Sequence, residues 1–351
     1  MKAAVIGGGF MGKQKPTIQD VADMADVSIA TVSRIINNKG NIKPSTLEKV
    51  ELAMKELNFI PKTLSMLSEA QSKIIMVCVP NLDNPFNSPV LEGIHRCAHA
   101  NGYHVLILET RDRDSRSEDF DELIRNNSIA GMVIMSNMPQ QKILEDLSFR
   151  CPTVMCSEYA ENYDRVSYVS IDDSAASKKA VDYLISTGRE KISLINTNLS
   201  FKYARHREKG YRQALEQAGL PVRPEWIIHL STTDYKLAFS NIYHMLSQAD
   251  RPDAIFATSD VYGVAAINAA HELGLLVPED LSVVGFDNID LSVMCIPPLT
   301  TIEQPCFQIG YQSCELLIDK IINPASSSKQ ILLNTELIVR GSTLLPKAAE
   351  S

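Results

Sequence analysis

Short, continuous apolar runs alternate with amphipathic stretches along most of the chain after residue 73. A strand that is apolar at every position is buried on both faces, so such runs predict parallel sheets covered by helices. Glycines follow four of the helical stretches, as helix C-terminal caps do before the next strand. The pattern therefore predicts repeated β-α units. The runs are Ile74–Val79, Val105–Leu108, Met132–Met135, Ile192–Ile195, Ala254–Ala257 and Ser282–Phe286, and the glycines are Gly102, Gly188, Gly219 and Gly274.

Residues 17–38 have helical rather than strand-like spacing, and they predict two short helices joined by a tight turn. Thr17 and Asp20 have the spacing of a capping box, so a helix should begin there. Asp26 tolerates the left-handed conformation of a tight turn, and the Ser28 hydroxyl can cap the second helix.

In the second helix, Val32 and either Ile35 or Ile36 are expected to be buried. The outward positions carry small, hydroxyl and single basic side chains, which a DNA major groove accepts. An arginine there can bond a guanine edge, and hydroxyls and helix N-terminal amides can hold phosphates. The alternative is a structural three-helix domain with a solvated face. The outward positions are Ile29, Ala30, Ser33, Arg34 and Asn37.

A third helix is predicted from Lys43–Glu48 onwards, with Ser45 and Glu48 as its capping box. The helix should end before Pro61, since the residue before a proline disfavours the helical conformation. The three helices together predict an all-α helix-turn-helix headpiece. The apolar stripe of the third helix consists of Leu47, Val50, Met54 and Leu57.

Composition supports a multi-domain chain in which DNA binding is confined to the beginning. The 351 residues are 45% hydrophobic, enough for the cores of one small and two medium domains. The net charge of -8 argues against nucleic acid, but residues 13–67 hold eight Lys and Arg against six Asp and Glu. A weakly basic head on an acidic body suits DNA binding by the head alone.

The seven cysteines are odd in number, and no two have CxxC spacing. Disulfides and zinc are therefore not expected, and a reducing cytoplasm fits. No apolar run reaches the roughly 18 residues of a membrane span. The seven histidines lack a paired nucleophile or metal-ligand spacing, so the sequence predicts no catalytic site, metal or cofactor.

Residues 1–15 contain Gly7–Gly12, which formally match G-x-G-x-x-G. A dinucleotide site needs the last glycine to open a helix and an acidic residue about 20 positions later, after a second strand. Neither follows, so an oxidoreductase is a weak alternative. A secretory signal also fits poorly, because the apolar core is short and glycine-rich. We expect these residues to form a mobile extension.

The residues DVADMADVSIATVSRIINN resemble the DNA-binding headpiece of the lac repressor (LacI/GalR) family, whose pattern is roughly D-V-A-x-x-A-G-V-S-x-x-T-V-S-R-x-x-N. The likeness continues through the chain to Gly341–Thr343. It implies that Ile29 and Ala30 read bases and that Arg34 is the arginine of the recognition helix. Asp26 replaces the usual turn glycine. The remaining implied DNA-binding or supporting positions are Thr17, Ser28, Thr31, Ser33 and Asn37.

The resemblance also implies how the chain is divided. Residues 16–61 form the DNA-binding domain, residues 62–72 a hinge, and residues 73–346 an effector-binding and dimerisation domain. In the family the hinge folds on operator DNA and wedges a leucine into the minor groove. The family's leucine position is Ser68 here, so Leu64 or Leu67 would be the inserted residue.

From the resemblance, residues 73–346 adopt the α/β type I periplasmic-binding-protein-like fold, a core of two doubly wound parallel-sheet subdomains. The N-subdomain comprises 73–172 and 303–332, and the C-subdomain comprises 173–300 and 334–346. The chain would cross between them near Asp172, Thr301 and Asn334. A ligand in the cleft could then set the angle between the halves.

Loops that follow strand C-termini bind the ligands of such folds. By the resemblance, Asn84 and Phe86 provide polar and stacking contacts to a sugar ring, and Arg207 forks onto ligand oxygens. Asp287 accepts hydrogen bonds from vicinal hydroxyls. The other effector-binding candidates are Tyr203, Ser259 and a wall formed by Tyr235 or Thr233.

These candidates also have simpler explanations. Asp260 or Asp287 could cap the helix that follows it, and Phe86 could belong to the core. Arg205 is expected to form a surface or interhalf ion pair rather than a ligand contact.

Together these features predict a ligand-responsive, sequence-specific transcriptional regulator, a repressor rather than an enzyme. A homodimer would place two headpieces on a palindromic double-stranded operator, since twofold symmetry needs matched half-sites. The effector is expected to be a small sugar or nucleoside. The C-terminal third is most similar to cytidine-responsive members of the family, which favours a nucleoside. The alternative is a transport-type sugar-binding protein, which would need a signal peptide and no headpiece.

Overall fold

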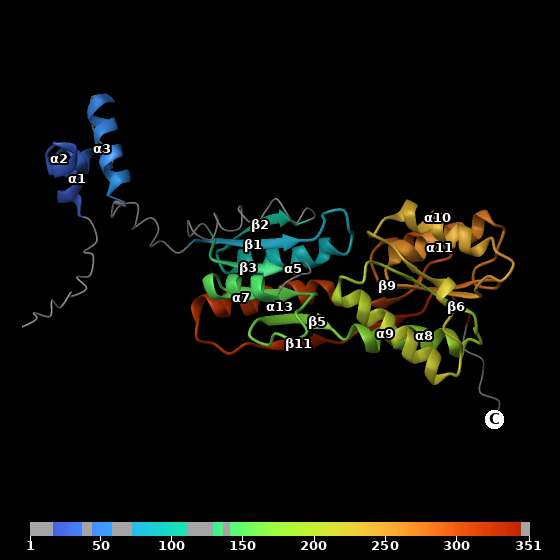
Figure 1. Cartoon of the computed structure of the whole chain (residues 1–351). Helices are drawn as coiled ribbons and strands as arrows, with labels where there is room; N and C mark the ends of the chain where they lie inside the picture. The colour runs from blue at the N-terminus through green and yellow to red at the C-terminus, as the bar shows by residue number, and fades with distance from the viewer. Residues whose placement is uncertain (1–16, 37–43, 58–71, 111–128, 136–140, 345–351) are drawn as a thin grey trace, which may run out of the picture. The chain divides into compact units, whose positions relative to one another are not determined.

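The computed structural model describes residues 17–36, 44–57, 72–110, 129–135 and 141–344 (Figure 1). The chain divides into two compact units, 1–72 and 73–351, and each is described by itself. Several predicted features lie outside the described residues: the extension 1–15, Asn37, and the hinge leucines Leu64 and Leu67.

The first unit holds the predicted helix-turn-helix, α1 (Ile18–Ala25) and α2 (Ile29–Ile36), followed by α3 (Pro44–Glu56). The capping box is confirmed: the Thr17 hydroxyl accepts from the Asp20 amide, and the Asp20 carboxylate accepts from the Thr17 amide. Asp26 ends α1 with a φ of 53°, in the left-handed region that the turn requires.

The three helices pack around an apolar core in which Val21, Val32 and Val50 have no exposed surface. Two expectations for the third helix are wrong. The helix begins at Pro44, a residue favoured at the first helical position, so Ser45 lies in the first turn instead of capping it. Leu47 is 39% exposed and does not belong to the core.

The second unit contains two six-stranded sheets covered by helices (Figure 1). We call the first sheet and its helices the N-lobe. The strand order is β11-β5-β4-β3-β1-β2, and every pair is parallel. The strands are β1 (Ile74–Val79), β2 (His104–Glu109), β3 (Gly131–Ile134), β4 (Thr153–Cys156), β5 (Ser167–Ile171) and β11 (Gln330–Leu333), and the helices are α5 (Asn87–Ala100), α7 (Gln141–Arg150) and α13 (Cys306–Ile322).

The second sheet and its helices form the C-lobe, with the strand order β12-β10-β9-β8-β6-β7. All pairs are parallel except β12, which runs antiparallel to β10 and so departs from the predicted all-parallel sheet. The strands are β6 (Ile192–Asn196), β7 (Ile227–His229), β8 (Ala254–Ala257), β9 (Ser282–Asp287), β10 (Thr300–Glu303) and β12 (Glu336–Ile338). The helices are α8 (Asp173–Ser186), α9 (Lys202–Gln217), α10 (Tyr235–Leu246), α11 (Asp260–Glu272) and α12 (Leu291–Met294), with a 3-10 turn at Pro224–Trp226.

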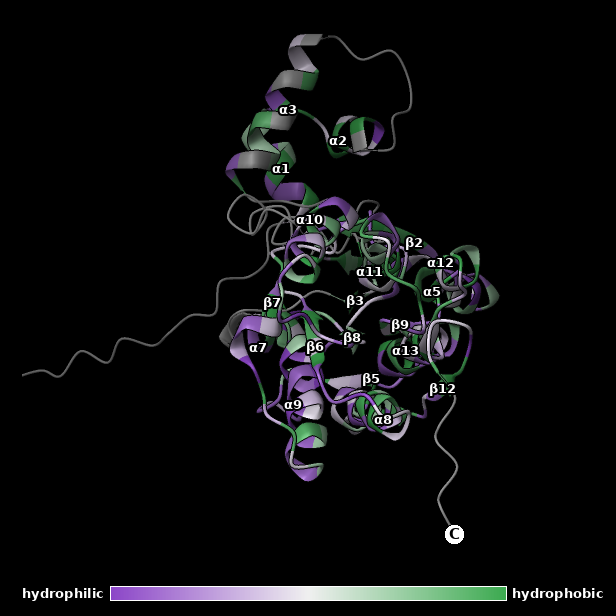
Figure 2. Ribbon diagram, turned by 90° about the vertical axis from the view of Figure 1, so that its right-hand side faces the viewer, coloured by the Kyte–Doolittle hydropathy of each residue, from purple (hydrophilic) through white to green (hydrophobic). Residues whose placement is uncertain are grey.

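Helices surround the strands, and pairs of helices pack closely against each other (Figure 2). A side chain on Gly310 of α13 would collide with the Val90 carbonyl of α5, and one on Gly210 of α9 would collide with the Ser174 carbonyl of α8. Glycine is therefore required at these two helix crossings. The four predicted helix-ending glycines all have φ between 68° and 89°, which confirms their role as C-terminal caps.

The chain passes between the lobes at residue 172, at 304–305 and at 334–335. Thr301, where the second crossing was predicted, lies inside β10 instead. The prediction that the apolar runs are buried on both faces fails for β2, where Leu106 and Ile107 are 41% and 42% exposed, because β2 is an edge strand.

Candidate DNA-binding and effector-binding sites

Helix α2 presents a largely exposed front with the residues expected to contact DNA. Ile29 is 43% exposed, and Ala30 and Arg34 are also exposed, while Val32 is fully buried on the opposite side. Ser28 precedes the helix, and its hydroxyl accepts from the Thr31 amide at 3.2 Å. The start of α2 is thus a capped helix end that carries small and hydroxyl side chains, as a groove-reading helix requires.

Two predicted supporting residues have local structural roles. The Thr31 hydroxyl is half-buried and lies 2.9 Å from the Ser28 hydroxyl. Thr17 caps α1, and its hydroxyl donates to the Asp20 carboxylate at 2.7 Å. Ser33 is half-buried.

A cavity of about 380 Å³ lies between the two lobes. The loops that follow the strands β1, β3, β4, β6, β7, β8 and β10 all contribute to its walls, together with the ends of β2 and β9. This is the arrangement that the parallel sheets predict, because the carboxyl ends of both sheets face the cleft. The wall residues are Pro80, Asn81, Asp83, Asn84, Phe86, Asn87, Thr110, Met135, Ser157, Glu158, Thr197, Phe201, Tyr203, Arg207, Ser231, Thr232, Thr233, Asp234, Thr258, Asp287 and Gln304.

The structure brings five of the seven predicted effector residues to this cavity: Asn84, Phe86, Tyr203, Arg207 and Asp287. The other two, Tyr235 and Ser259, do not line it, whereas Thr233, the predicted alternative to Tyr235, does.

Tyr235 does not line the cavity. It begins α10, is 39% exposed, and its hydroxyl accepts from the Asn268 amide at 2.8 Å. Its neighbours Thr233 and Asp234 form the wall instead.

Ser259 lies behind the cavity wall. Its hydroxyl caps α11 by accepting from the Val261 amide and donates to the Asp287 carboxylate at 3.2 Å. Ser259 therefore orients the Asp287 carboxylate by a hydrogen bond, and it does so without lining the cavity itself.

Arg207 is a buried cation held by carboxylates. Its Nε donates to Asp173 at 2.9 Å, and its Nη1 donates to the Thr258 carbonyl at 2.7 Å and lies 3.6 Å from Asp287. The guanidinium also lies over the Phe286 ring at 3.6 Å. Arg207 therefore holds a fixed position at the cavity wall.

Asp287 ends β9 and receives several hydrogen bonds. Gln304 donates to Oδ1 at 2.7 Å and Ser259 to Oδ2. Burial raises the pKa of Asp287 to about 6, against the opposing effects of the Arg207 charge and these hydrogen bonds. The residue has a φ of 114°, and such strained backbone is concentrated at functional sites.

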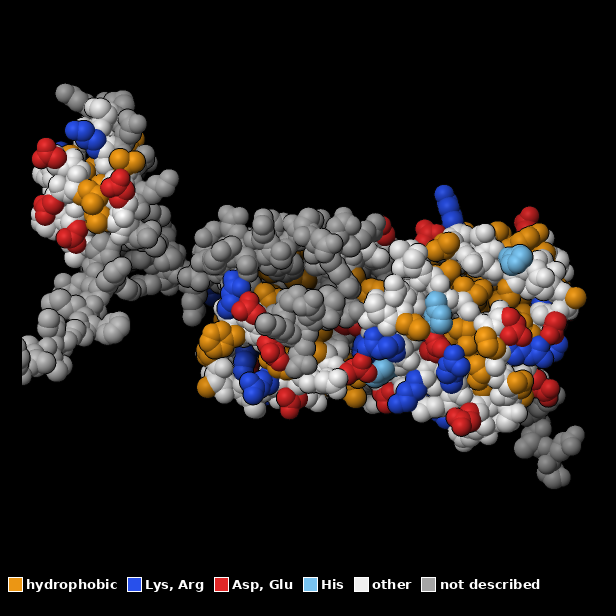
Figure 3. Space-filling model, viewed as in Figure 1, with side chains coloured by type: hydrophobic (Ala, Val, Ile, Leu, Met, Phe, Trp, Pro, Cys, Tyr) orange, Lys and Arg blue, Asp and Glu red, His pale blue; other side chains and the backbone are white. Residues whose placement is uncertain are grey.

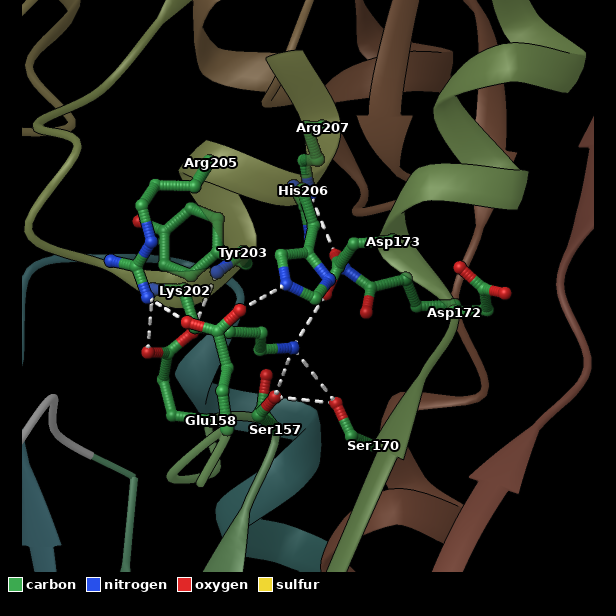
Figure 4. Close-up of polar contacts among 12 residues, drawn as sticks. Ser157, Glu158, Ser170, Asp172, Asp173, Lys202, Tyr203, Arg205, His206 and Arg207 are labelled. Atoms are coloured by element: carbon green, nitrogen blue, oxygen red, sulfur yellow. Dashed lines mark hydrogen bonds and ion pairs between the residues drawn. The ribbon is translucent and has the colours of Figure 1, made fainter. Parts of the chain in front are cut away.

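A second group of charged residues joins the lobes beside the cavity, and we call it the clasp. It consists of Glu158, Glu161, Lys202, Arg205 and His206, all of which except Glu161 are labelled in Figure 4. Helix α9 has no capping side chain of its own. Glu158, from the N-lobe loop after β4, instead accepts from the Lys202 and Tyr203 amides, both at 3.0 Å. Glu158 is 3% exposed, and burial raises its pKa, while the Lys202 charge partly opposes that rise.

The Lys202 ammonium is also buried and crosses the same junction. It donates to Asp173 of the C-lobe at 2.7 Å and to Ser170 of the N-lobe at 3.3 Å, and it lies 4.2 Å from the centre of the Tyr159 ring. Burial alone would raise the pKa of Asp173, but the charges of Lys202 and Arg207 outweigh it and hold that pKa below its usual value.

The outer part of the clasp is exposed to solvent. Glu161 accepts from Arg205, and its other oxygen lies 2.7 Å from His206 Nε2. The predicted interhalf ion pair of Arg205 is thereby confirmed. Figure 3 shows basic and acidic side chains interspersed where the lobes adjoin on this face.

Sequence patterns did not identify four residues of these sites: Glu158, Gln304, Asp173 and Lys202. Glu158 and Gln304 directly follow β4 and β10, so the rule that ligands meet loops after strands would have found them had these short strands been predicted. Asp173 and Lys202 stand at helix starts, where a charged residue is ordinarily solvated, and only the packing of the lobes buries them.

Among the described residues, no group of three His, Cys, Asp or Glu side chains is arranged to hold a metal ion. In the same part of the chain, no helix is both long and apolar enough to cross a membrane.

Residues 17–62 match the family model of bacterial regulatory proteins, lacI family, and residues 181–343 match that of the periplasmic binding protein-like domain. The chain is 36% identical over 329 residues to the HTH-type transcriptional repressor CytR of Escherichia coli (strain K12), covering 93% of this chain and 96% of that protein.

Two solved structures are similar over nearly the whole chain. The transcriptional regulator CelR in complex with cellobiose has a TM-score of 0.72 and 27% identity, over 93% of this chain and 99% of that one. The lac repressor dimer bound to operator and the anti-inducer ONPF has a TM-score of 0.70 and 27% identity, over 94% of this chain and 100% of that one.

Proposed function

The chain belongs to the lacI family of bacterial regulatory proteins, and from its two sites we propose that it is a repressor switched by a small molecule. The repressor binds a near-palindromic operator as a homodimer. A sugar or nucleoside in the cleft between the lobes changes its affinity for that operator. Family membership supports a DNA-binding regulator, and not an enzyme.

One observation carries the small-molecule part of the proposal. The first turns of α9 place Tyr203 and Arg207 at the cavity, while Lys202 and Arg205 on the same turns hold the N-lobe. A ligand that contacts α9 therefore acts on the element that sets how the lobes meet. This gives the ligand different contacts in different lobe arrangements, which any effector needs in order to shift an equilibrium.

The chemistry of the cavity suits a sugar or a nucleoside. Phe86, Phe201 and Tyr203 place aromatic rings in the cavity wall, where a sugar ring or a planar base can pack. Asp287 accepts hydrogen bonds of the kind that hydroxyl groups donate. The similar CelR was solved with a sugar, cellobiose, which supports this class of ligand.

Exposed apolar side chains on the C-lobe support the homodimer. Val293, Met294 and Ile296 are 55%, 71% and 90% exposed in and beside α12. Hydrophobic side chains also gather over α10 and α11 on the face seen in Figure 3. Such surfaces mark contacts with other proteins, and the similar lac repressor was solved as a dimer. Sedimentation equilibrium should give twice the chain mass of 38.8 kDa.

Arg34→Ala tests the DNA-binding part. A preferred duplex is first selected from random DNA with the full chain, and binding is then measured by fluorescence anisotropy. Loss of a bidentate base contact should weaken binding to the selected duplex by about 10- to 100-fold, with little change for random duplex. The control is Lys49→Ala on the exposed side of α3. Unchanged selectivity in Arg34→Ala would remove Arg34 from base recognition.

A further inference from the structure

The charge of the cavity wall narrows the class of ligand that it accepts. Four carboxylates line the cavity, those of Asp83, Glu158, Asp234 and Asp287, against one guanidinium, that of Arg207. Arg207 is already matched by Asp173 and Asp287. In the described part of the wall, negative charge therefore exceeds positive charge.

The second cation near the cavity is Lys202, and it is directed elsewhere. Its ammonium contacts Asp173, Ser170 and the Ser157 carbonyl, and it does not line the cavity. A phosphate in the cavity would therefore meet carboxylates without a lysine to match it.

Helix N-termini are the other common binding site for phosphate, and at this cavity the N-termini of α5, α9, α10 and α11 are occupied. The Lys202 and Tyr203 amides of α9 donate to Glu158. Asp234 caps α10 by accepting from the Leu237 amide at 2.7 Å, and Ser259 caps α11.

Helix α5 completes this set. Its first two amides, Asn87 and Ser88, donate to the carbonyls of Asn84 and Pro85, and the third residue, Pro89, has no N–H. The described helices α5, α9, α10 and α11 thus have protein acceptors at their N-termini, and two of them are capped by carboxylates. Helix α13, which begins two residues after Gln304, has no side-chain cap.

Among the described wall residues, one fully buried side-chain polar atom lacks a hydrogen-bond partner, and it is an acceptor. Gln304 is 4% exposed, and its Nε2 donates to Asp287 at 2.7 Å. This bond fixes the orientation of the amide, since the reverse orientation would place two oxygens together. Gln304 Oε1 is buried and has no hydrogen-bond partner within the described residues. A buried acceptor of this kind requires a donor, and a ligand can supply it.

We infer that the effector is a neutral or cationic molecule rich in O–H or N–H donors, one of which binds Gln304 Oε1, and that forms carrying a phosphate are excluded. This inference rests on the proposed function, because it concerns the ligand of the same cleft. It distinguishes free sugars and nucleosides from sugar phosphates and nucleotides, which the proposed function alone does not do.

The test compares matched pairs on the full chain by thermal shift and isothermal titration calorimetry. The probes are ribose, glucose, cytidine and adenosine, each with its 5- or 6-phosphate or 5′-monophosphate. At least one unphosphorylated probe should bind, and its phosphate should bind on the order of 100-fold more weakly because of carboxylate repulsion. A phosphorylated probe that binds as tightly as its partner overturns the inference while leaving the proposed function intact. Binding by none of the probes overturns both.

Gln304→Leu tests the acceptor with the probe that binds best. Affinity should fall about tenfold, since the ligand donor loses its partner. Gln308→Leu is the matched control, because it makes the same change at an exposed position four residues later, in the first turn of α13. If both variants fold and bind the probe with equal affinity, Gln304 does not belong to the ligand site.

Discussion

The two glutamates of the clasp differ in burial, and replacing each by glutamine should therefore have different consequences. Glu158 is buried and caps α9, whereas the side chain of Glu161 is 39% exposed and pairs with Arg205 and His206. Both belong to the same N-lobe loop, and both contact the same helix. Because the chemical change is the same, comparing the two variants separates the contribution of a buried carboxylate from that of an exposed one.

The expected magnitude follows from the hydrogen bonds of Glu158. Glutamine keeps one acceptor oxygen, so one of the Lys202 and Tyr203 amides is left buried without a partner, at about 1–3 kcal/mol. The lost carboxylate also leaves the α9 N-terminus without a compensating charge, which costs about 0.3–1 kcal/mol. A neutral side chain avoids the desolvation that raises the Glu158 pKa, and this offsets part of the loss. We expect a net loss of about 1–3 kcal/mol.

Glu161→Gln should cost less. Its ion pairs are in contact with solvent, so screening limits their combined contribution to about 1 kcal/mol or below. That small effect should shrink further in 0.5 M NaCl, whereas the effect of Glu158→Gln should not.

The assay is urea unfolding followed by the fluorescence of Trp226, which is buried in the C-lobe and is the single tryptophan. Titration of the effector under the same conditions measures the coupling. Glu158 also lines the cavity, so Glu158→Gln should weaken effector binding about tenfold through the lobe arrangement and the changed wall together, whereas Glu161→Gln, outside the wall, should weaken it less than fivefold. If the two variants lose equal amounts of unfolding free energy and of effector affinity, the Glu158 cap of α9 is not the main connection between the lobes.

Two further predictions concern pH and the headpiece turn. Because the pKa of Asp287 is raised to about 6 by burial, effector affinity should fall about tenfold from pH 7 to pH 5, as the carboxylate that accepts ligand hydroxyls becomes protonated. Folding stability depends on pH in the opposite direction. The contribution of Asp287 to the free energy of unfolding is fully present below about pH 4 and is lost as pH rises through 6. Calorimetry of the wild type and Asp287→Asn checks this, and a pH dependence that survives in the variant would contradict it. Asp26→Gly should stabilise the headpiece by about 0.5–1 kcal/mol by removing the left-handed strain at φ 53°, with an unchanged or lower melting temperature as the contrary result.

The sequence predicted most of the fold because its signals are local. Six apolar runs became strands, and Thr17 with Asp20 formed the predicted capping box. The errors arose where two local preferences compete or where a strand is not apolar throughout. Pro44 took the start of α3 from Ser45. Strands β4 and β10 begin with threonine and so do not form continuous apolar runs, unlike β8, which has the same length and was predicted.

The cavity was predicted less completely, for a geometric reason. Side chains at the start of a helix diverge by about 100° per residue, so Asp234 lines the cleft while the adjacent Tyr235 faces Asn268. No pattern along the chain predicts which of two adjacent side chains faces the cavity. The partnership of Glu158 with α9 joins residues 44 positions apart in different lobes, and it exists only because the lobes meet.

The lobes contact each other through apolar side chains near the crossings and through polar groups at the clasp. This distribution suits a protein whose lobes change their arrangement better than one whose lobes are rigidly fixed. Near the crossings, Ile171, Ile302 and Cys306 belong to one apolar cluster, so the lobes stay joined there. At the clasp, the contacts are charges and hydrogen bonds. An apolar seam at the clasp would hold the lobes together whether or not ligand is present, since separating it exposes hydrophobic surface to water. Separated charges regain hydration, which keeps the open and closed arrangements within a few kcal/mol of each other. A ligand that contacts α9 can therefore shift an equilibrium of that size.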